Sequence, residues 1–286
     1  MRNPYKIEGP ALISFSGGRT SGYMLHRILE AHDGKLPEDV FVVFANTGKE
    51  AEQTLEFVDK CSREWNVKVH WLEHYFANER PKHRTKEVCF KTAARNGEPF
   101  ERLIDDRKFL PNPVARFCTS ELKIKVMKRF MQSKGHKEWF NVLGLRYDEP
   151  HRAVRARNQT WDKWINICPM YDSQETNDDV LKFWENNDFD LKLTSVGGKT
   201  LAGNCDLCFL KAKSTIVKII EEEPDRADWW IKQEQKFDQK KGKATKGGPK
   251  ATFRKDRDFI QLKEIATGPK QQLFIDDESF SCFCHD

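Results

Sequence analysis

The sequence contains no long apolar run, and this absence limits where the chain can work. No stretch approaches the roughly 20 apolar residues that a helix needs to cross a bilayer. Residues 1–10 also contain no apolar segment of the signal-peptide type. Charged residues make up 33% and hydrophobic residues 38%, a balance typical of a globular chain in water. We therefore expect a cytoplasmic protein with no membrane partner.

The sequence also lacks the common nucleotide-binding motifs. The 286 residues contain no internal repeat, no Walker phosphate loop and no Rossmann glycine pattern. The net charge is only +5, but it is uneven: Lys236–Arg257 carries nine Lys and Arg residues against two Asp residues. This stretch is either a solvated loop or an electrostatic grip on nucleic acid. In the cytoplasm the eight cysteines favour metal or thiol chemistry over disulfides.

Short apolar runs alternate with helical patterns along the first two thirds of the chain. Such alternation predicts an α/β fold, with a mostly parallel sheet and flanking helices. We place a soft boundary near residue 190, where periodicity changes, so that 1–190 forms the main domain and 191–286 a smaller cysteine-containing region. The expected strands are 11–15, 40–44, 67–72 and 140–144, and expected helices include 119–131 and 176–187.

A glycine pair follows the first expected strand and precedes a helical pattern. Gly17 and Gly18 allow a close backbone approach, while neighbouring hydroxyls and backbone N–H groups converge at a helix N-terminus. This arrangement suits phosphate, although a plain turn with a helix cap has the same composition. The predicted phosphate-binding residues are Ser14, Ser16, Gly17, Gly18, Arg19, Thr20 and Ser21.

Four segments in order resemble one family. Residues 16–21, Ser-Gly-Gly-Arg-Thr-Ser, resemble the PP-loop, Ser-Gly-Gly-x-Asp-Ser, of the adenine nucleotide α-hydrolase superfamily. Residues 44–48 with Gln53-Thr54, residues 118–123 (Cys-Thr-Ser-Glu-Leu-Lys) and residues 144–152 resemble further motifs of its phosphoadenosine phosphosulfate (PAPS/APS) reductase-like family. Together these segments cover roughly residues 11–184. The resemblance implies a HUP-like fold that binds an adenine nucleotide.

The resemblance also assigns nucleotide contacts, and the sequence departs from it in places. The implied contacts with adenosine, phosphate or sulfate are Asn46, Thr47, Gly48, Gly144, Arg146 and Arg152. Arginine suits oxyanions because its guanidinium pairs with two oxygens at once, but surface ion pairing would also explain these arginines. Thr20 and Asn46 stand where the family has Asp, and Pro150 where it has Ser. The change at Thr20 weakens the case for Mg²⁺-ATP chemistry.

The cysteines suggest a metal centre. Cys205-Asp-Leu-Cys208 can clamp one metal from a tight turn, and Cys118 lies in the Leu-Lys motif. Cluster-bearing APS reductases hold a [4Fe-4S] cluster on a Cys-Cys pair and a Cys-x-x-Cys pair, so the resemblance implies a cluster that needs one more ligand here. Cys282 or Cys284 can supply it, and we expect Cys284. Zinc on the same residues is the alternative.

The tail also offers a nucleophile. Cys282-Phe-Cys-His285 resembles the reductases' C-terminal Glu-Cys-Gly-x-His, which implies that Cys282 attacks the substrate with His285 and Lys123 in supporting roles. The expected activity is reduction of an adenylyl sulfate (APS or PAPS), with a thioredoxin-like reductant as partner. One alternative is an ATP-dependent sulfurtransferase of the tRNA thiolation or DNA phosphorothioation type, which would use ATP and Mg²⁺. Another is a non-catalytic nucleotide- and metal-binding module.

Overall fold

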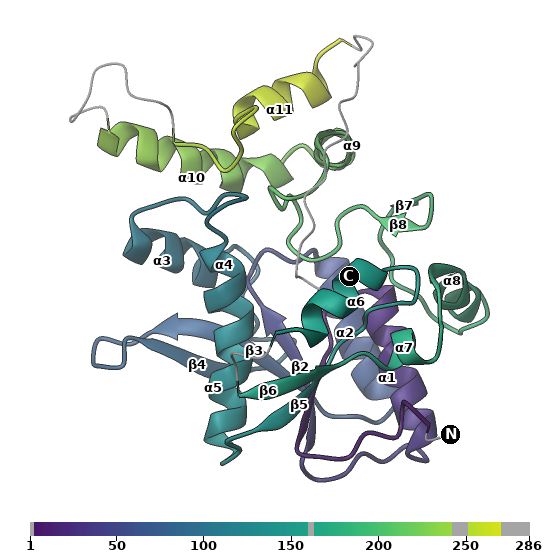
Figure 1. Cartoon of the computed structure of the whole chain (residues 1–286). Coiled ribbons are helices and arrows are strands. Elements are labelled where there is room, and N and C mark those ends of the chain that lie inside the picture. Colours follow the sequence, from purple (N-terminus) through teal and green to yellow (C-terminus); the bar gives the residue numbers. More distant parts are fainter. Residues whose placement is uncertain (1–2, 160–162, 242–250, 270–286) are drawn as a thin grey trace.

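A six-stranded sheet with the order β4-β3-β2-β1-β5-β6 forms the centre of the protein (Figure 1). The structure is a computed structural model that describes residues 3–159, 163–241 and 251–269. Five strands run parallel, and β4 runs antiparallel to β3 at one edge. The predicted α/β fold with a mostly parallel sheet is therefore confirmed.

The elements follow the expected alternation over most of the chain. The strands are β1 (Ala11–Ser14), β2 (Val40–Asn46), β3 (Val69–Phe76), β4 (His83–Val88), β5 (Trp139–Val142), β6 (Trp164–Ile167), β7 (Ser195–Val196) and β8 (Lys199–Thr200). The helices are α1 (Arg19–Ala31), α2 (Glu52–Glu64), α3 (Glu98–Arg107), α4 (Phe117–Thr119), the π-helix η1 (Ser120–Ile124), α5 (Lys125–Ser133), α6 (Pro150–Arg157), α7 (Pro169–Asp172), α8 (Asn177–Glu185), α9 (Lys213–Glu222), α10 (Arg226–Lys241) and α11 (Phe259–Thr267).

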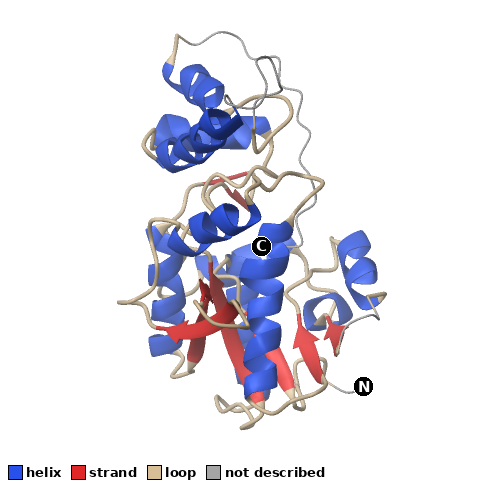
Figure 2. Cartoon of the chain, turned by 90° about the vertical axis from the view of Figure 1, so that its left-hand side faces the viewer, coloured by secondary structure: helices blue, strands red, loops and turns tan. Residues whose placement is uncertain are grey.

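The sheet lies between two layers of helices because both of its faces are apolar (Figure 2). Successive side chains of a strand point to opposite faces. Leu12 and Val43 accordingly join a buried cluster with α5, whereas Ile13 and Phe44 join a larger cluster with α1, α2 and α8. This continuous burial explains why the central strands read as unbroken apolar runs.

Two local features were not anticipated. The segment after β3 contains the edge strand β4, which is not among the expected strands because its polar sequence lacks the pattern of a buried strand. The helix expected over 119–131 is interrupted by η1, a π-helical turn inside the Cys118–Lys123 motif. π-Helical turns occur often at functional sites.

The strand order creates a crevice beside the glycine pair. After β1 the chain proceeds outward to β2 and β3, and it returns to β5 on the other side of β1. Ligands of open α/β sheets bind at such reversals, beyond the carboxyl ends of the strands. The loop after β1 and the loop after β5 both leave the sheet at this point.

The region after residue 190 adds the small β7–β8 hairpin and three helices. Figure 1 shows α9, α10 and α11 grouped together beyond the sheet. Trp230 and Phe253 of this region belong to the same buried cluster as residues of β1 and α1. The boundary near residue 190 therefore stays a prediction. In the part of the chain described, no helix is long and apolar enough to cross a bilayer.

Candidate functional site

The loop between β1 and α1 is held in one conformation by its own hydroxyls and by a packing constraint. Gly17 has a φ of +82°, and a Cβ there would lie 2.7 Å from Thr54 Cγ2. Ser16 Oγ and Ser21 Oγ lie 3.0 Å apart, and Ser21 Oγ donates to the Gly18 carbonyl at 3.0 Å. α1 therefore begins directly after a constrained loop at the carboxyl end of β1, and the N-terminus of a helix in this position can bind an anion.

Arg19, a predicted phosphate contact, makes its hydrogen bonds within the chain. Its guanidinium makes five hydrogen bonds: two to Asp190 at 2.7 Å, and one each to Ser195, Thr200 and the Leu191 carbonyl. A guanidinium has five N–H donors, so these contacts use all of them. The side chain therefore connects the loop to the 190–200 segment.

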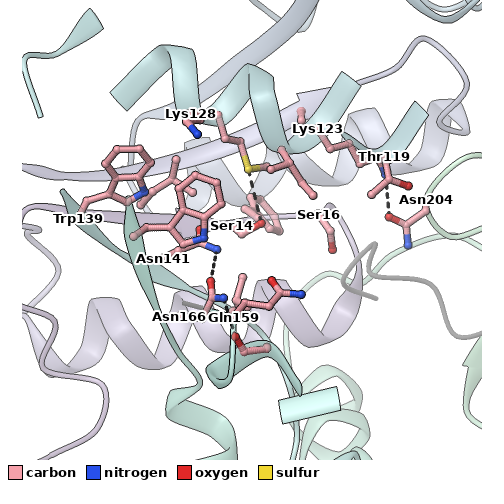
Figure 3. Close-up of a pocket in the computed structure, with 18 residues that line it drawn as sticks. Ser14, Ser16, Thr119, Lys123, Lys128, Trp139, Asn141, Gln159, Asn166 and Asn204 are labelled. Atoms are coloured by element: carbon pink, nitrogen blue, oxygen red, sulfur yellow. Dashed lines mark hydrogen bonds between the residues drawn. The ribbon is translucent and has the colours of Figure 1, made fainter. Parts of the chain in front are cut away.

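A pocket of about 200 Å³ opens beside this loop (Figure 3). It brings together the loop after β1, the Cys118–Lys123 motif and Asn204, which directly precedes Cys205. Three predicted site residues, Ser14, Ser16 and Lys123, line it. The polar lining side chains are Ser14, Ser16, Thr119, Lys123, Lys128, Asn141, Gln159, Asn166 and Asn204.

The far end of the pocket is built from a pattern that the sequence analysis missed. β5 contains Trp139-Phe-Asn141 and β6 contains Trp164-Ile-Asn166, and these residues pair in register. The two indole rings stack 5.3 Å apart, and Asn141 Nδ2 donates to Asn166 Oδ1 at 2.8 Å. The repeated Trp-x-Asn was the signal available, because alternation in paired strands places both residue types on one face. Aromatic and amide groups together suit a nucleobase.

The Cys205–Cys208 turn is attached to the carboxyl end of β2. Glu50 and Cys205 form an antiparallel backbone bridge, and the Asp206 N–H donates to the Lys49 carbonyl at 2.7 Å. Lys49 Nζ lies 3.2 Å from Asp206 Oδ2 in an ion pair whose side chains are 9% and 8% exposed. Asp206 Oδ1 also accepts a hydrogen bond from Trp230 Nε1 at 3.0 Å. α10 therefore braces this turn from the other side.

This attachment places the thiol-bearing turn beside the pocket. Cys205 Sγ lies 3.4 Å from Thr47 Oγ1. Lys123 Nζ donates to Asn204 Oδ1 at 3.1 Å and lies 3.9 Å from Glu50 Oε1. Lys123 and Cys118 belong to one motif, so the structure brings the two predicted cysteine elements to the same end of the sheet.

The donor set fits a thiolate-bound cluster. Cys118, Cys205 and Cys208 are all partly exposed and pack on one buried cluster. Thiolates bind zinc as well as iron–sulfur clusters, so these three side chains suit either kind of centre. Cys282, Cys284 and His285 lie outside the described residues, so their roles stay predictions.

Asn46, Thr47 and Gly48, which are predicted nucleotide contacts, lie at the end of β2 and in the segment after it. The Asn46 amide donates to Glu73 Oε1 at 2.7 Å and to the Ala94 carbonyl at 2.9 Å, and its Oδ1 accepts from the Gly48 N–H. The Thr47 N–H and hydroxyl both donate to Glu50. These side chains therefore shape the turn, and a nucleotide contact here would come from the backbone. Gly48 has a φ of +79°, which explains the glycine.

The predicted arginines lie near the loop but are also paired with acidic neighbours. Arg146 Nη1 donates to Thr20 Oγ1 at 3.0 Å, and Arg146 Nε donates to Asp148 at 3.0 Å. Arg152 pairs with Glu149. Close packing of Gly144, whose Cβ would lie 3.4 Å from Ser21 Cα, keeps Arg146 at the start of α1. The motif thus reaches the PP-loop through Arg146.

Two of the remaining described cysteines are core residues. Cys61 and Cys168 are fully buried, and burial raises the pKa of Cys61 well above its usual range and that of Cys168 to about 11. Such thiols pack as small apolar side chains and are poor nucleophiles. Cys89 is exposed, and its hydrogen bond with Thr92 lowers the pKa of its thiol.

Two described cations of the basic stretch make contacts within the chain. Lys236 Nζ lies 2.6 Å from Asp105 and 3.3 Å from Glu101. Arg254 donates to the Phe209 and Lys211 carbonyls and pairs with Asp256. These two cations stabilise the fold. Residues 242–250 lie outside the described residues, so the predicted nucleic-acid contact is not tested there.

Comparisons with known proteins support the resemblance. The sequence profile of the phosphoadenosine phosphosulfate reductase domain family matches residues 10–193. An uncharacterised protein of Methanocaldococcus jannaschii is 27% identical over 176 residues, which cover 60% of this chain and 31% of that protein. An uncharacterised nin-region protein of Escherichia phage lambda is 26% identical over 209 residues, which cover 72% of this chain and 67% of that protein. This chain thus spans less than a third of the archaeal relative.

Two solved structures are similar at low identity. One is a PAPS reductase from Candida auris in a phosphate complex, with a TM-score of 0.44 and 14% identity over 70% of this chain and 90% of that one. The other is the U34-tRNA thiolase NcsA from Methanococcus maripaludis with its [4Fe-4S] cluster, with a TM-score of 0.41 and 15% identity over 79% of this chain and 72% of that one.

The buried ion pair gives a testable prediction. Asp206→Asn keeps an acceptor for Trp230 but leaves the Lys49 charge buried and unpaired, so we expect the free energy of unfolding to fall by roughly 3–5 kcal/mol in urea melts. The matched control is Asp59→Asn, which breaks the more exposed pair with Arg63 and should cost less than about 1 kcal/mol. Equal losses in the two variants would contradict a special role for the Lys49–Asp206 pair.

Proposed function

The chain belongs to the phosphoadenosine phosphosulfate reductase domain family, and we propose that it binds an adenine nucleotide and reduces an adenylyl sulfate through a cysteine thiolate. One observation carries this proposal: a single pocket collects the loop after β1, Thr119 and Lys123 of the cysteine motif, and Asn204 beside Cys205. A nucleotide bound in this pocket would have one end close to the Cys205–Cys208 turn.

The lining suggests how the substrate lies. The anionic phosphosulfate would occupy the end formed by Ser16, Thr119 and Lys123, where a lysine charge and the α1 N-terminus meet. The adenine would lie toward Asn141 and Asn166, whose amides offer donors and acceptors for its edge. Arg146, which contacts Thr20 at the start of α1, would add charge from the other side of the loop.

The proposed reaction uses two thiols. The Cys282 thiolate, assisted by His285, attacks the sulfur of the adenylyl sulfate; the bond from sulfur to the phosphate oxygen breaks, and the nucleotide leaves with that electron pair. The enzyme then carries Cys–S–SO₃⁻. A thiolate of a thioredoxin-like dithiol attacks the Cys282 sulfur, releases sulfite and forms a mixed disulfide, which the second thiol resolves. The two electrons that reduce the sulfate thus come from the dithiol.

A cluster would be held by Cys118, Cys205 and Cys208, with Cys284 as the proposed fourth ligand. When bound, a [4Fe-4S] cluster supplies a redox-active centre whose properties depend on burial and on hydrogen bonds to its sulfurs. Thr47 Oγ1, 3.4 Å from Cys205 Sγ, is one such neighbour. Lys123 would keep a positive charge between this centre and the substrate sulfate.

The second candidate is an ATP-dependent sulfurtransferase. The nearly complete Ser-Gly-Gly-x-x-Ser loop favours it. One contact disfavours it: Arg146 donates to Thr20, which stands where the family has the carboxylate expected for Mg²⁺-ATP chemistry. We therefore prefer the reductase, and ATP enters the experiments below as the discriminating ligand.

Lys123→Met provides a test of the anion end of the pocket. A charged hydrogen bond contributes about 1.5–3 kcal/mol, so we expect APS to bind roughly 10- to 100-fold more weakly by calorimetry. Adenosine, which lacks the anion, should bind with nearly unchanged affinity. The matched control is Lys128→Met, another lysine of the lining, which lies over the Trp164 ring at 5.4 Å and should weaken APS less. An equal loss of adenosine and APS binding would place the phosphosulfate elsewhere.

Variants of the two tail cysteines distinguish a nucleophile from a metal ligand. After incubation with APS, PAPS or ATP, intact mass spectrometry of the wild type should show a sulfonate adduct with APS or PAPS alone. Cys282→Ser should abolish this adduct and keep its iron, because a nucleophile is not a ligand. Cys284→Ser should lose iron, because a missing thiolate opens the coordination shell.

Cys89→Ser is the control, since it removes an exposed thiol outside the site. It should change neither the adduct nor the iron content. If no sulfonucleotide leaves an adduct on the iron-loaded wild type, and ATP with Mg²⁺ is instead hydrolysed, the sulfurtransferase is the better account.

A further inference from the structure

Two histidines and a glutamate meet between β3, β4 and η1. His74 Nε2 lies 3.1 Å from His83 Nδ1, and His83 Nδ1 lies 4.0 Å from a Glu121 oxygen, Oε2. The three ligand atoms all lie within 4.8 Å of one another. His74 is 1% exposed and Glu121 is 3% exposed, whereas the His83 side chain is 29% exposed. The group is thus a buried cluster with one opening.

From this cluster we propose a binding site for one divalent transition-metal ion, zinc by ligand type, on His74, His83 and Glu121. Two imidazole nitrogens and one carboxylate oxygen are a known zinc donor set, usually completed by water. Bonds of roughly 2.0–2.1 Å in a tetrahedron place such ligands about 3.4 Å apart. The observed 3.1 and 4.0 Å bracket that spacing, so small side-chain shifts suffice.

One of the three ligand atoms has an ion-pair contact with Arg129 but no hydrogen bond among the described residues. A hydrogen bond between the two imidazoles would pair one nitrogen of each ring, but Glu121 Oε2 is buried and accepts no hydrogen bond within the described part of the chain. A buried, unsatisfied carboxylate oxygen is costly. An ion would satisfy all three ligand atoms at once. Phe76 packs against both imidazole rings and gives the site an apolar wall.

The protonation states suit metal binding. Burial lowers the pKa of His74 to about 4, so its imidazole is neutral near pH 7, as a ligand must be. Burial opposes ionisation of Glu121, but Lys125 and the other neighbouring cations outweigh it and lower the pKa of the carboxyl. Arg107 and Lys125 both contact Oε1 and leave Oε2 directed at the histidines. Asp106 Oδ2 lies 3.8 Å from His83 Nε2, where a carboxylate orients a metal-bound histidine.

One cation competes for the same oxygen. Arg129 Nη2 lies 3.6 Å from Glu121 Oε2, and an incoming ion would have to displace it. This competition makes Arg129 useful in the test, because its removal should strengthen binding. Glu121 lies in η1 between Thr119 and Lys123, so the ion would tie this pocket-lining segment to β3 and β4. The site is independent of the proposed reaction.

The test measures zinc per chain in EDTA-stripped protein that is re-equilibrated with Zn²⁺ and desalted. His83→Asn, on the edge strand β4, should bind one equivalent of zinc less than wild type. Both proteins keep all their cysteines, so zinc bound by thiols contributes equally to the two values. Glu121→Gln should lose the same equivalent. His70→Gln, a buried histidine of β3 that pairs with Glu87 instead, should lose none.

Two further measurements keep the proposal falsifiable if a variant is unstable. Arg129→Met should tighten zinc binding roughly tenfold, because a nearby positive charge is removed. In a Cys205→Ser background, Co²⁺ should give visible bands without sulfur charge-transfer absorption, and adding His83→Asn should abolish these bands. Equal zinc contents in wild type and His83→Asn, or cobalt bands that require Cys205, would overturn the proposal.

Discussion

The site depends on the buried contact between Lys49 and Asp206. The two residues come from different regions: Lys49 follows β2, and Asp206 lies inside the Cys205–Cys208 turn. Their ion pair, the backbone bridge beside it and the Trp230 hydrogen bond fix the thiol-bearing turn at the carboxyl end of the sheet. Because removing one partner of such a pair leaves a buried charge, the turn and the sheet are strongly coupled.

A second long-range contact completes the arrangement. Arg19, directly after the glycine pair, pairs with Asp190, which lies 171 residues away. The loop after β1 and the turn that carries the thiols both contact residues near or beyond the predicted boundary at 190. The pocket between them is therefore a property of the whole described chain, and the C-terminal region takes part in building it.

The sequence predicted the central strands and the loop because both signals are local. Buried parallel strands read as apolar runs, and Gly17 is required by its φ of +82° and its contact with Thr54. The partners of Arg19 and Asn46 could not be predicted, since a side chain's long-range hydrogen bonds leave no local pattern. β4 was missed because an edge strand carries polar residues, and η1 because a π-helical turn has the composition of an α-helix. The paired Trp-x-Asn in β5 and β6 was visible but had no meaning until the strands were known to be neighbours.

The central claim is that nucleotide and thiol chemistry meet in one pocket, and a crystal structure of anaerobically purified protein with APS tests it most directly. The account predicts the phosphosulfate against Ser16 and Lys123, the adenine toward Asn141, and iron bound by Cys118, Cys205 and Cys208 next to the sulfate. A nucleotide bound elsewhere, or thiols holding a single zinc ion remote from it, would contradict the account.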